Sequence, residues 1–273
     1  MAKYIEIKDG KLSAKIAPNN GGMLTQLTLD GTDVMAFHED AVELTPMGAG
    51  GAPVMFPFPG RTADDTYVIE NREYGMPMHG LVKNAAFAVK SRSENSVTLW
   101  CDGSSSQKEA NYPFDYLLEI EYKVAGNSLS ITARVTNHSD KPLPHCLGWH
   151  PFFKATDKAS LVFEHSMTSH YDYINCKDEP TIENLDFSKK WDDVFHTPKK
   201  KECTLYNQRD GYKLRLVLDD AHNVLVVFSG SEGAICLEPW CGIPNSINNG
   251  RFVKYVQPGK TESYKVVLEL EKL

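Results

Sequence analysis

The sequence predicts an all-β fold of antiparallel strands. Three observations support this: several long segments alternate apolar and polar residues with a period of two, Asp-Gly pairs separate neighbouring segments of this kind, and no helix-length apolar pattern lies between them. The chain has 273 residues, a length that β-sandwiches and barrels reach as one domain. Because no linker or repeat divides it, we expect one domain over residues 1–273.

The N-terminal part predicts two successive hairpins. Asp9-Gly10 lies within IEIKDGKLSAKIAP, and Asp30-Gly31 lies within LTLDGTDVM. Asp-Gly pairs tolerate the positive φ angles that two-residue hairpin turns require. Each pair therefore marks a tight turn between two strands.

Four later segments predict longer, half-buried strands. Within SLSITARVT, for example, Leu129 and Ile131 alternate with polar residues, so that one face of the strand would be buried. The other three segments are DYLLEIEYKV, YKLRLVLDD and SYKVVLELEKL. Short helical turns are expected only at residues 104–114 and 186–195, and neither changes the fold class.

Charge and composition exclude several classes of function. The chain carries 29 Lys and Arg against 36 Asp and Glu, a formal net charge of −7, so a polyanion such as nucleic acid is not an expected partner. No segment has the length or apolarity of a signal peptide or membrane span, which predicts a cytoplasmic protein. Six scattered cysteines without a CxxC pair predict reduced thiols and no metal site.

Four polar residues interrupt apolar or Pro/Gly-rich stretches: Arg61 in FPGRT, His79 in MPMHGL, His150 in GWHPFF and Glu238 in AICLEPW. Singly, the arginine and the histidines have ordinary structural explanations, in surface turns or as buried rings bonded to backbone. Glu238 is harder to explain, because a carboxylate at the end of a buried strand costs several kcal/mol unless it is paired or solvated in a cleft.

Together these residues suggest a small-molecule site. Trp149 and Trp240 stand beside His150 and Glu238 in the sequence. Aromatic faces suit the C–H face of a sugar, and charged or imidazole groups suit its hydroxyls. The sequence contains no GxGxxG, GxxxxGK[ST] or GxSxG motif, so proton transfer to a sugar without a cofactor is the chemistry that remains.

Five stretches, in order, resemble the aldose 1-epimerase (galactose mutarotase-like) superfamily and most of all its LacX-like branch. They are GGAPVMFPFPGRT, YGMPMHGLVKNAAF, HCLGWHPFF, WDDVF and ICLEPWCGIPNSIN, and they span most of the chain. The resemblance implies a large antiparallel β-sandwich, the galactose mutarotase-like supersandwich. It also implies an isomerase that interconverts the α and β anomers of a hexose or related aldose, and it gives no oligomeric state.

The resemblance also implies roles for individual residues. Glu238 matches the general base, His150 the general acid, and His79 a second histidine near the ring oxygen of the sugar. Arg61 matches a substrate-binding arginine, and Trp149 and Trp240 are expected to contact the sugar. An aspartate that binds hydroxyls is best matched by Asp192, with Asp193 as the neighbouring alternative.

Two departures from the family pattern concern the substrate. Pro239 and Trp240 follow Glu238 where many members have Thr-Gln, and the arginine lies in PGRT and not in an Asn-Arg-Ile context. A free or a 6-phosphorylated hexose would both fit the motifs. For the acid–base pair we expect an ionised glutamate, and a histidine whose pKa is raised by neighbouring carboxylates.

Three other functions remain open at the level of sequence. A carbohydrate-binding module would use the same fold and aromatic residues without catalysis. A cupin-like metal enzyme would use His79, His145, His150 and Glu238, although the usual H-x-H pair is absent. A glycoside hydrolase would pair Asp192 with Glu238 and leave both motif histidines unexplained.

Overall fold

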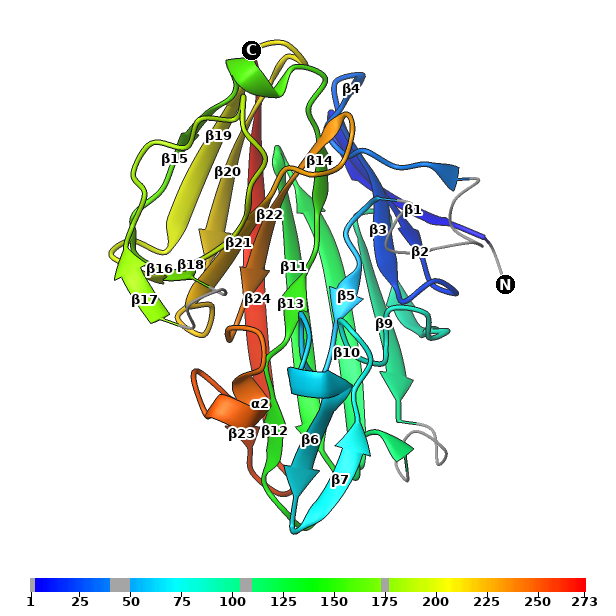
Figure 1. The fold of residues 1–273 in the computed structure, drawn as a ribbon. Helices are drawn as coiled ribbons and strands as arrows, with labels where there is room; N and C mark the ends of the chain where they lie inside the picture. Colours follow the sequence, from blue (N-terminus) through cyan, green and yellow to red (C-terminus); the bar gives the residue numbers. More distant parts are fainter. Residues whose placement is uncertain (1–2, 40–49, 104–109, 173–176) are drawn as a thin grey trace.

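The computed structural model describes residues 3–39, 50–103, 110–172 and 177–273, and in these ranges nearly all of the regular secondary structure is β-strand (Figure 1). Two large antiparallel sheets dominate, which confirms the predicted antiparallel β-sandwich. Their apolar residues meet in one large core cluster, to which Leu129 and Ile131 contribute from one sheet and Ile235 and Leu237 from the other.

The first sheet, here the β24 sheet, contains the four long strands expected from alternation. Its order is β15-β19-β20-β24-β11-β10-β9-β8. In β11 every second residue is buried, as the pattern of SLSITARVT predicts. The strands are β8 (Ala88–Arg92), β9 (Ser96–Asp102), β10 (Tyr116–Ala125), β11 (Ser128–Asn137), β15 (Val162–Glu164), β19 (Glu202–Asn207), β20 (Tyr212–Leu218) and β24 (Thr261–Lys272).

The second sheet, here the β22 sheet, has the order β17-β16-β18-β21-β22-β13-β5, with β14 also paired to β22. Its central strand β22 is buried along its whole length, because both of its faces are covered. The strands are β5 (Val54–Met55), β13 (Gly148–Trp149), β14 (Phe152–Lys154), β16 (Met167–Asp172), β17 (Lys177–Pro180), β18 (Asp192–Pro198), β21 (Val224–Phe228) and β22 (Ala234–Trp240).

Smaller elements complete the described chain. A four-stranded sheet contains both predicted hairpins: Asp9 ends β1 and Gly10 begins the turn to β2, and Asp30-Gly31 lies between β3 and β4. Gly10 and Gly31 both have positive φ, as the turns require. The elements are β1 (Ile5–Asp9), β2 (Leu12–Ala17), β3 (Met23–Leu29), β4 (Thr32–Asp33), η2 (Ala63–Asp65), β6 (Thr66–Ile69), β7 (Arg72–Gly75), β12 (Leu143–His145), η3 (Lys158–Ser160), α2 (Ser246–Asn249) and β23 (Lys254–Val256).

The two faces of β22 have different roles. Ile235 and Leu237 join the main core between the sheets, whereas Cys236 and Trp240 belong to smaller clusters. Successive side chains of a strand alternate between faces, so Glu238 shares the face of Cys236 and Trp240. This face points away from the β24 sheet, and it is where functional groups gather.

The prediction of a helical turn at residues 186–195 is wrong for residues 192–195, which form part of a strand. Asp192 begins strand β18, which pairs on one side with β16 and on the other with β21. Long-range pairing on both edges outweighs the local helical preference of the segment. The other expected turn, at residues 104–114, lies mostly outside the described residues.

Two further observations concern the described chain as a whole. None of its helices is long and apolar enough to cross a membrane. The described cysteines, Cys101, Cys146, Cys203, Cys236 and Cys241, are free thiols, and all of them are buried.

We predict that Gly80→Ala will destabilise the protein by roughly 3 kcal/mol or more, because two penalties add. Gly80 has a φ of +79°, and a Cβ there would lie 2.2 Å from the carbonyl oxygen of Phe56. Gly10 is the matched control, since its φ is +56° and its Cβ would meet nothing within 4 Å. Gly10→Ala should therefore cost only about 1–2 kcal/mol. Urea unfolding of both variants gives the comparison, and equal losses would contradict it.

Candidate active site

A cavity of about 550 Å³ lies on the outer face of the β22 sheet. Segments that are far apart in the sequence meet around it: the loop after β5, the loop after β7, the β13–β14 connection, and strands β16, β18, β21 and β22. The cavity contains every residue predicted for the site except Trp149. Its lining residues are Gly60, Arg61, Thr62, Ala63, Met78, His79, His150, Tyr171, Asp192, Val226, Phe228, Glu238, Trp240, Pro244 and Asn245.

Glu238 is the buried carboxylate of the cavity. It lies opposite Val226 in the β21–β22 ladder and is only 1% exposed. Burial raises the pKa of this carboxyl well above its ordinary value, and the negative charge of Asp192 raises it further. The indole N–H of Trp240 partly opposes this rise but makes no well-directed hydrogen bond. Oε2 of Glu238 has no hydrogen-bond partner among the described residues.

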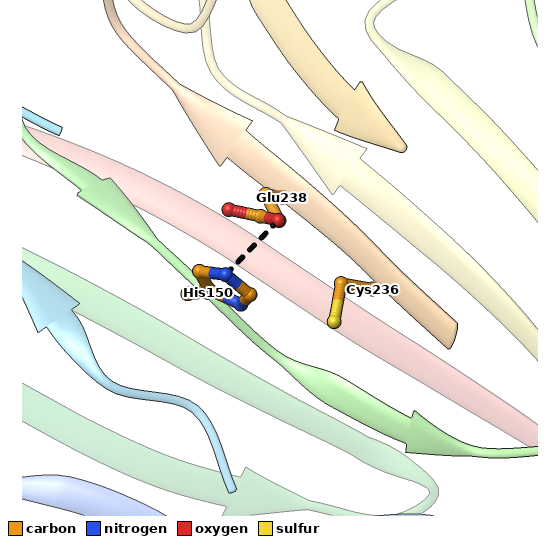
Figure 2. Close-up of side chains that lie close together, drawn as sticks. All are labelled: His150, Cys236 and Glu238. Atoms are coloured by element: carbon orange, nitrogen blue, oxygen red, sulfur yellow. Dashed lines mark ion pairs between the residues drawn. The ribbon is translucent and has the colours of Figure 1, made fainter. Parts of the chain in front are cut away.

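His150 faces Glu238 from the connection between β13 and β14. Its Nε2 lies 3.3 Å from Oε1 of Glu238 (Figure 2). The backbone N–H of His150 donates to the carbonyl of Pro53, and the imidazole stacks on Phe152 with 4.5 Å between ring centroids. The backbone and the aromatic neighbour therefore fix the direction in which the imidazole points.

The expectation that neighbouring carboxylates raise the pKa of His150 is wrong. Burial lowers this pKa to about 3, and the nearby His79 adds to the effect. Desolvation penalises the imidazolium more than the neighbouring carboxyl group favours it. Since burial also raises the pKa of Glu238, the pair holds one proton in total from about pH 3 up to the raised pKa of the glutamate.

His79 is held in one tautomer by Gly60, which lies in the loop after β5. The backbone N–H of Gly60 donates to Nδ1 of His79 at 3.2 Å, and the N–H of His79 donates to the carbonyl of Gly60 at 2.8 Å. Because Nδ1 accepts, Nε2 carries the hydrogen of the neutral ring. Burial, together with the charges of Lys83 and Arg61, lowers the pKa of His79 to about 4. The ring is thus a neutral hydrogen-bond donor beside His150, with 5.5 Å between ring centroids.

Arg61 lies at the rim of the cavity with its side chain 62% exposed. Its Nη1 donates to both carboxylate oxygens of Asp65, at 2.9 and 3.0 Å. This contact orients the guanidinium and offsets its charge. Arg61 is therefore placed to contact a bound molecule at the mouth of the cavity and not at its buried end.

Strand alternation separates the two neighbouring aspartates of β18. Asp192 lines the cavity on the same face as Val194, a member of the cavity-side cluster. Asp193 points to the opposite face, where its carboxylate lies 2.6 Å from Nε2 of His170. Burial raises the pKa of Asp192, and the charge of Asp193 adds to this shift. Of the two candidates from the sequence, only Asp192 reaches the cavity.

The expectation that Trp149 contacts the ligand is corrected by its position. Trp149 is 1% exposed and does not line the cavity. Adjacent residues of an extended chain point to opposite faces, so Trp149 turns into the core where His150 turns out of it. The indole packs beside the ring of His222, with 5.5 Å between centroids. Trp149 thus supports the strand that holds His150.

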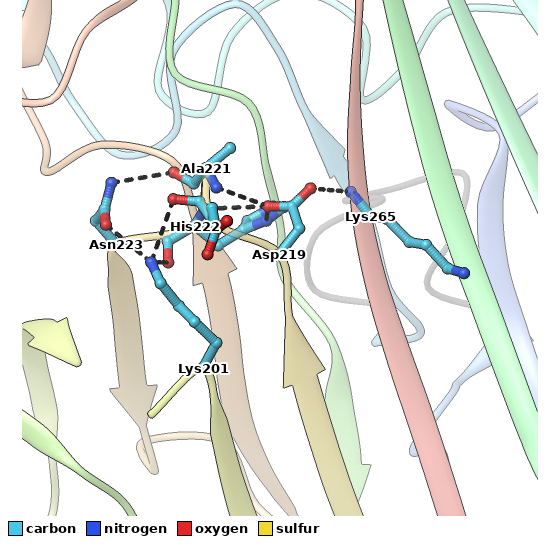
Figure 3. Close-up of polar contacts among 7 residues, drawn as sticks. Lys201, Asp219, Ala221, His222, Asn223 and Lys265 are labelled. Atoms are coloured by element: carbon cyan, nitrogen blue, oxygen red, sulfur yellow. Dashed lines mark hydrogen bonds and ion pairs between the residues drawn. The ribbon is translucent and has the colours of Figure 1, made fainter. Parts of the chain in front are cut away.

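A polar network fixes His222 behind this tryptophan (Figure 3). Asp219 accepts the ring Nδ1–H of His222 at 2.7 Å, and it also accepts backbone N–H groups of Ala221 and Lys265. Nζ of Lys201 donates to the carbonyl of His222 at 2.8 Å. These hydrogen bonds satisfy polar groups of the turn between β20 and β21. The strand that follows, β21, forms part of the cavity wall.

His145, the further histidine of the cupin-like alternative, does not reach the cavity. It is fully buried in the sandwich, and its Nε2 lies 2.9 Å from the hydroxyl of Tyr264. The four-residue set required by that alternative is therefore not assembled in the structure.

Several residues of the cavity were not anticipated. Tyr171 and Phe228 occupy β16 and β21, where nothing in the local sequence distinguishes them from other apolar strand residues. Asn245 lies in the loop after β22, within the stretch ICLEPWCGIPNSIN that carries the family resemblance. Its Oδ1 accepts the backbone N–H of Ala63, which joins this loop to the segment of Arg61.

Comparison with known proteins identifies the family of the chain. The family model for aldose 1-epimerase matches residues 3–269. The chain belongs to the aldose 1-epimerase family. The chain is also similar to the chromosomal LacX protein of Lactococcus lactis subsp. lactis, with 26% identity over 234 residues that cover 75% of this chain and 78% of LacX. The uncharacterized YihR protein of Escherichia coli K12 is 24% identical over 270 residues, covering 88% and 84%.

Solved structures of similar proteins have the same fold. The Slr1438 protein of Synechocystis sp. PCC 6803 superposes with a TM-score of 0.92 at 22% identity, covering 99% of this chain and 96% of that one. A galactose mutarotase related enzyme from Lactobacillus acidophilus gives a TM-score of 0.84 at 19% identity, covering 98% and 97%. At these identities the likeness establishes the sandwich and leaves the substrate open.

Proposed function

We propose that the protein is an aldose 1-epimerase that interconverts the α and β anomers of an aldose by acid–base ring opening. The observation that carries the proposal is the buried pair itself. A carboxyl group and an imidazole lie 3.3 Å apart at the buried side of a cavity, and Oε2 of Glu238 and Nδ1 of His150 have no other partner in the described chain. Such groups are costly to bury unless a ligand uses them.

The chemistry requires two proton transfers. Glu238 takes the proton of the anomeric hydroxyl, the C1=O bond forms, and the bond between C1 and the ring oxygen breaks. His150 gives a proton to the ring oxygen, so that a free aldehyde results. Rotation about C1–C2 followed by the reverse steps yields the other anomer. Because the pair holds one proton, moving it from the glutamate to the histidine creates the required base and acid together.

Other residues of the cavity suit the remaining atoms of a sugar. His79 offers its Nε2–H beside His150, where it can hydrogen-bond the ring oxygen. Asp192 and Arg61 are placed for hydroxyl groups, and Trp240 supplies a flat apolar wall. A few polar groups within a mostly apolar cleft are typical of sites that orient a small ligand.

For the substrate class we propose an unphosphorylated hexose or related aldose. Asp192 lines the cavity, the Glu238–His150 pair has no net charge while it holds one proton, and the charge of Arg61 is already offset by Asp65. A phosphate group would meet more negative than uncompensated positive charge there. A hexose 6-phosphate is the alternative, and a mutarotation panel over free and phosphorylated aldoses distinguishes the two. The free thiols of the described cysteines suit a reducing compartment, so we place the activity in the cytoplasm.

A second candidate function is sugar binding without catalysis, since the same cavity and aromatic wall would serve it. The enzyme is favoured because binding alone does not require a carboxyl group and an imidazole buried against each other. A rate of anomer exchange no faster than the spontaneous rate, with sugar bound, would favour the binding protein.

We predict that Glu238→Gln and His150→Asn will each lower the rate of mutarotation by about 10²–10⁴-fold, the usual contribution of a general acid or base. The double variant should be little worse than either single one, because both groups serve one transition state. Polarimetry on fresh α-anomer, with the spontaneous rate subtracted, measures this. Glu119→Gln is the control, since Glu119 is another buried carboxyl but lies on β10.

The control variant should keep the rate of the unaltered enzyme, and all of the variants should still bind sugar through the rest of the cavity. If Glu238→Gln kept more than about a tenth of the rate, the loss would be below ~1.4 kcal/mol, and Glu238 would not be the base.

Asp192→Asn should raise KM more than it lowers kcat, because we assign Asp192 to binding and not to proton transfer. Asp193→Asn is the matched control: it alters the adjacent carboxylate, which points away from the cavity toward His170. Saturation kinetics of both variants gives the comparison. An unchanged KM in Asp192→Asn, or the same rise in Asp193→Asn, would reject the assignment.

The rate should show a broad plateau in pH while the pair holds one proton. Its acidic limb should lie near pH 3–4, where His150 and His79 become protonated, because burial lowers their pKa values to about 3 and about 4. At higher pH the rate should fall as the pair loses its proton, at the raised pKa of Glu238. The dependence of kcat/KM on pH tests this, and an acidic limb near 6.5, the ordinary value for histidine, would contradict it.

A further inference from the structure

We propose that His150, Cys236 and Glu238 together bind a thiophilic divalent metal ion such as Zn²⁺ or Cd²⁺, and that the bound ion inhibits the enzyme. The metal site stands on its own geometry, whereas the inhibition rests on the proposed function. All three side chains are buried, and their ligand atoms lie within 4.8 Å of one another (Figure 2).

The strand pairing brings these three groups to one place. Cys236 and Glu238 are two residues apart in β22 and so share its outer face. Phe152 of β14 pairs with Cys236, and His150 precedes Phe152 by two residues in the same extended segment. Cys236 and Glu238 therefore lie on one strand, and His150 lies in a two-residue connection whose flanking strands pair with that strand through Gly148 and Phe152, so the mutual positions of the three groups are well defined.

The distances are close to those of a tetrahedral ion. Ligand atoms bound to zinc at about 2.1 Å are separated by about 3.4 Å from each other. Nε2 of His150 and Oε1 of Glu238 are 3.3 Å apart, which already matches this value. The ligand atoms lie within 4.8 Å of one another, so Sγ of Cys236 needs an approach of at most about 1.4 Å, which rotations of the cysteine and glutamate side chains can supply.

The donor set selects the kind of ion. One imidazole nitrogen, one thiolate and one carboxylate oxygen suit Zn²⁺ and Cd²⁺, whereas Mg²⁺ and Ca²⁺ prefer oxygen ligands alone. Burial raises the pKa of the Cys236 thiol well above its ordinary value, so the ion must displace the thiol proton, which leaves to solvent. Because His150 and Glu238 line the cavity, the fourth position of the ion would face the space where a sugar binds.

An ion in this position would block the proposed reaction. It would occupy the lone pair of the His150 nitrogen that faces Glu238, and it would neutralise the carboxylate. Neither group could then exchange a proton with a sugar. This differs from the cupin-like alternative, in which the metal would be required for activity and would be bound by His79 and His145 in addition to His150 and Glu238.

The test uses the full chain freed of metal by EDTA and dialysis. Addition of CdCl2 should produce the ultraviolet charge-transfer band of a cadmium thiolate at one equivalent, and ZnCl2 should lower the rate of mutarotation at least tenfold. EDTA should reverse both effects, and MgCl2 should cause neither. The absorption band is read without sugar, so it tests the metal site even if the protein is not a mutarotase.

Variants identify the ligands. Cys236→Ser should lose the band and require at least tenfold more Zn²⁺ for the same inhibition. Cys203→Ser is the matched control, because Cys203 is also a buried thiol but lies on β19 of the other sheet, and it should behave as the unaltered protein. If Cys236→Ser does not fold, Glu238→Gln serves instead, and it should weaken cadmium binding while it keeps the thiol.

Three results would overturn the proposal. One is an unchanged cadmium band in Cys236→Ser. Another is a band at one equivalent without loss of activity in an otherwise active enzyme. The last is an enzyme that is inactive after chelation and regains activity with zinc, which would make the ion an activator.

Discussion

The organisation of the site depends on one unfavourable interaction, the burial of Glu238 against His150. Both groups are almost fully buried, and burial raises the pKa of the carboxyl and lowers the pKa of the imidazole. The result is a pair with one proton that can lie on either partner. A surface pair would hold its charges in water and would respond far less to a sugar placed beside it.

The fold supports this pair because the two faces of the β22 sheet have different functions. The inner face of β22 stabilises the sandwich through Ile235 and Leu237, and its outer face carries Glu238 and Trp240. The same division occurs in β18, where Asp192 reaches the cavity and Asp193 does not. Each of these strands therefore contributes one face to the stability of the sandwich and the other face to the site.

Contacts around the cavity fix the tautomers and the orientations of its side chains. The N–H of Gly60 fixes the tautomer of His79, and the ring of Phe152 fixes the plane of His150. Asp219 holds the ring of His222 (Figure 3), and this ring packs beside Trp149. The proximity of Cys236 to the pair is a further consequence of strand alternation, and it gives the same site a set of ligands for a thiophilic ion.

The sequence alone determined the strand content, the two Asp-Gly hairpins and the residue types of the site, because alternation, turn chemistry and motifs are local in the chain. From it alone, Glu238, His150, His79, Arg61, Asp192 and Trp240 were all predicted at the site, and the structure brings them to one cavity. Strand pairing and burial, which only the tertiary structure shows, decided the rest. They turn Trp149 into the core, bring only one of two adjacent aspartates to the cavity, and place Tyr171 and Phe228 in its wall. The tertiary structure also reversed the expected pKa shift of His150, since desolvation depends on every segment packed around the ring and not on its neighbours in sequence.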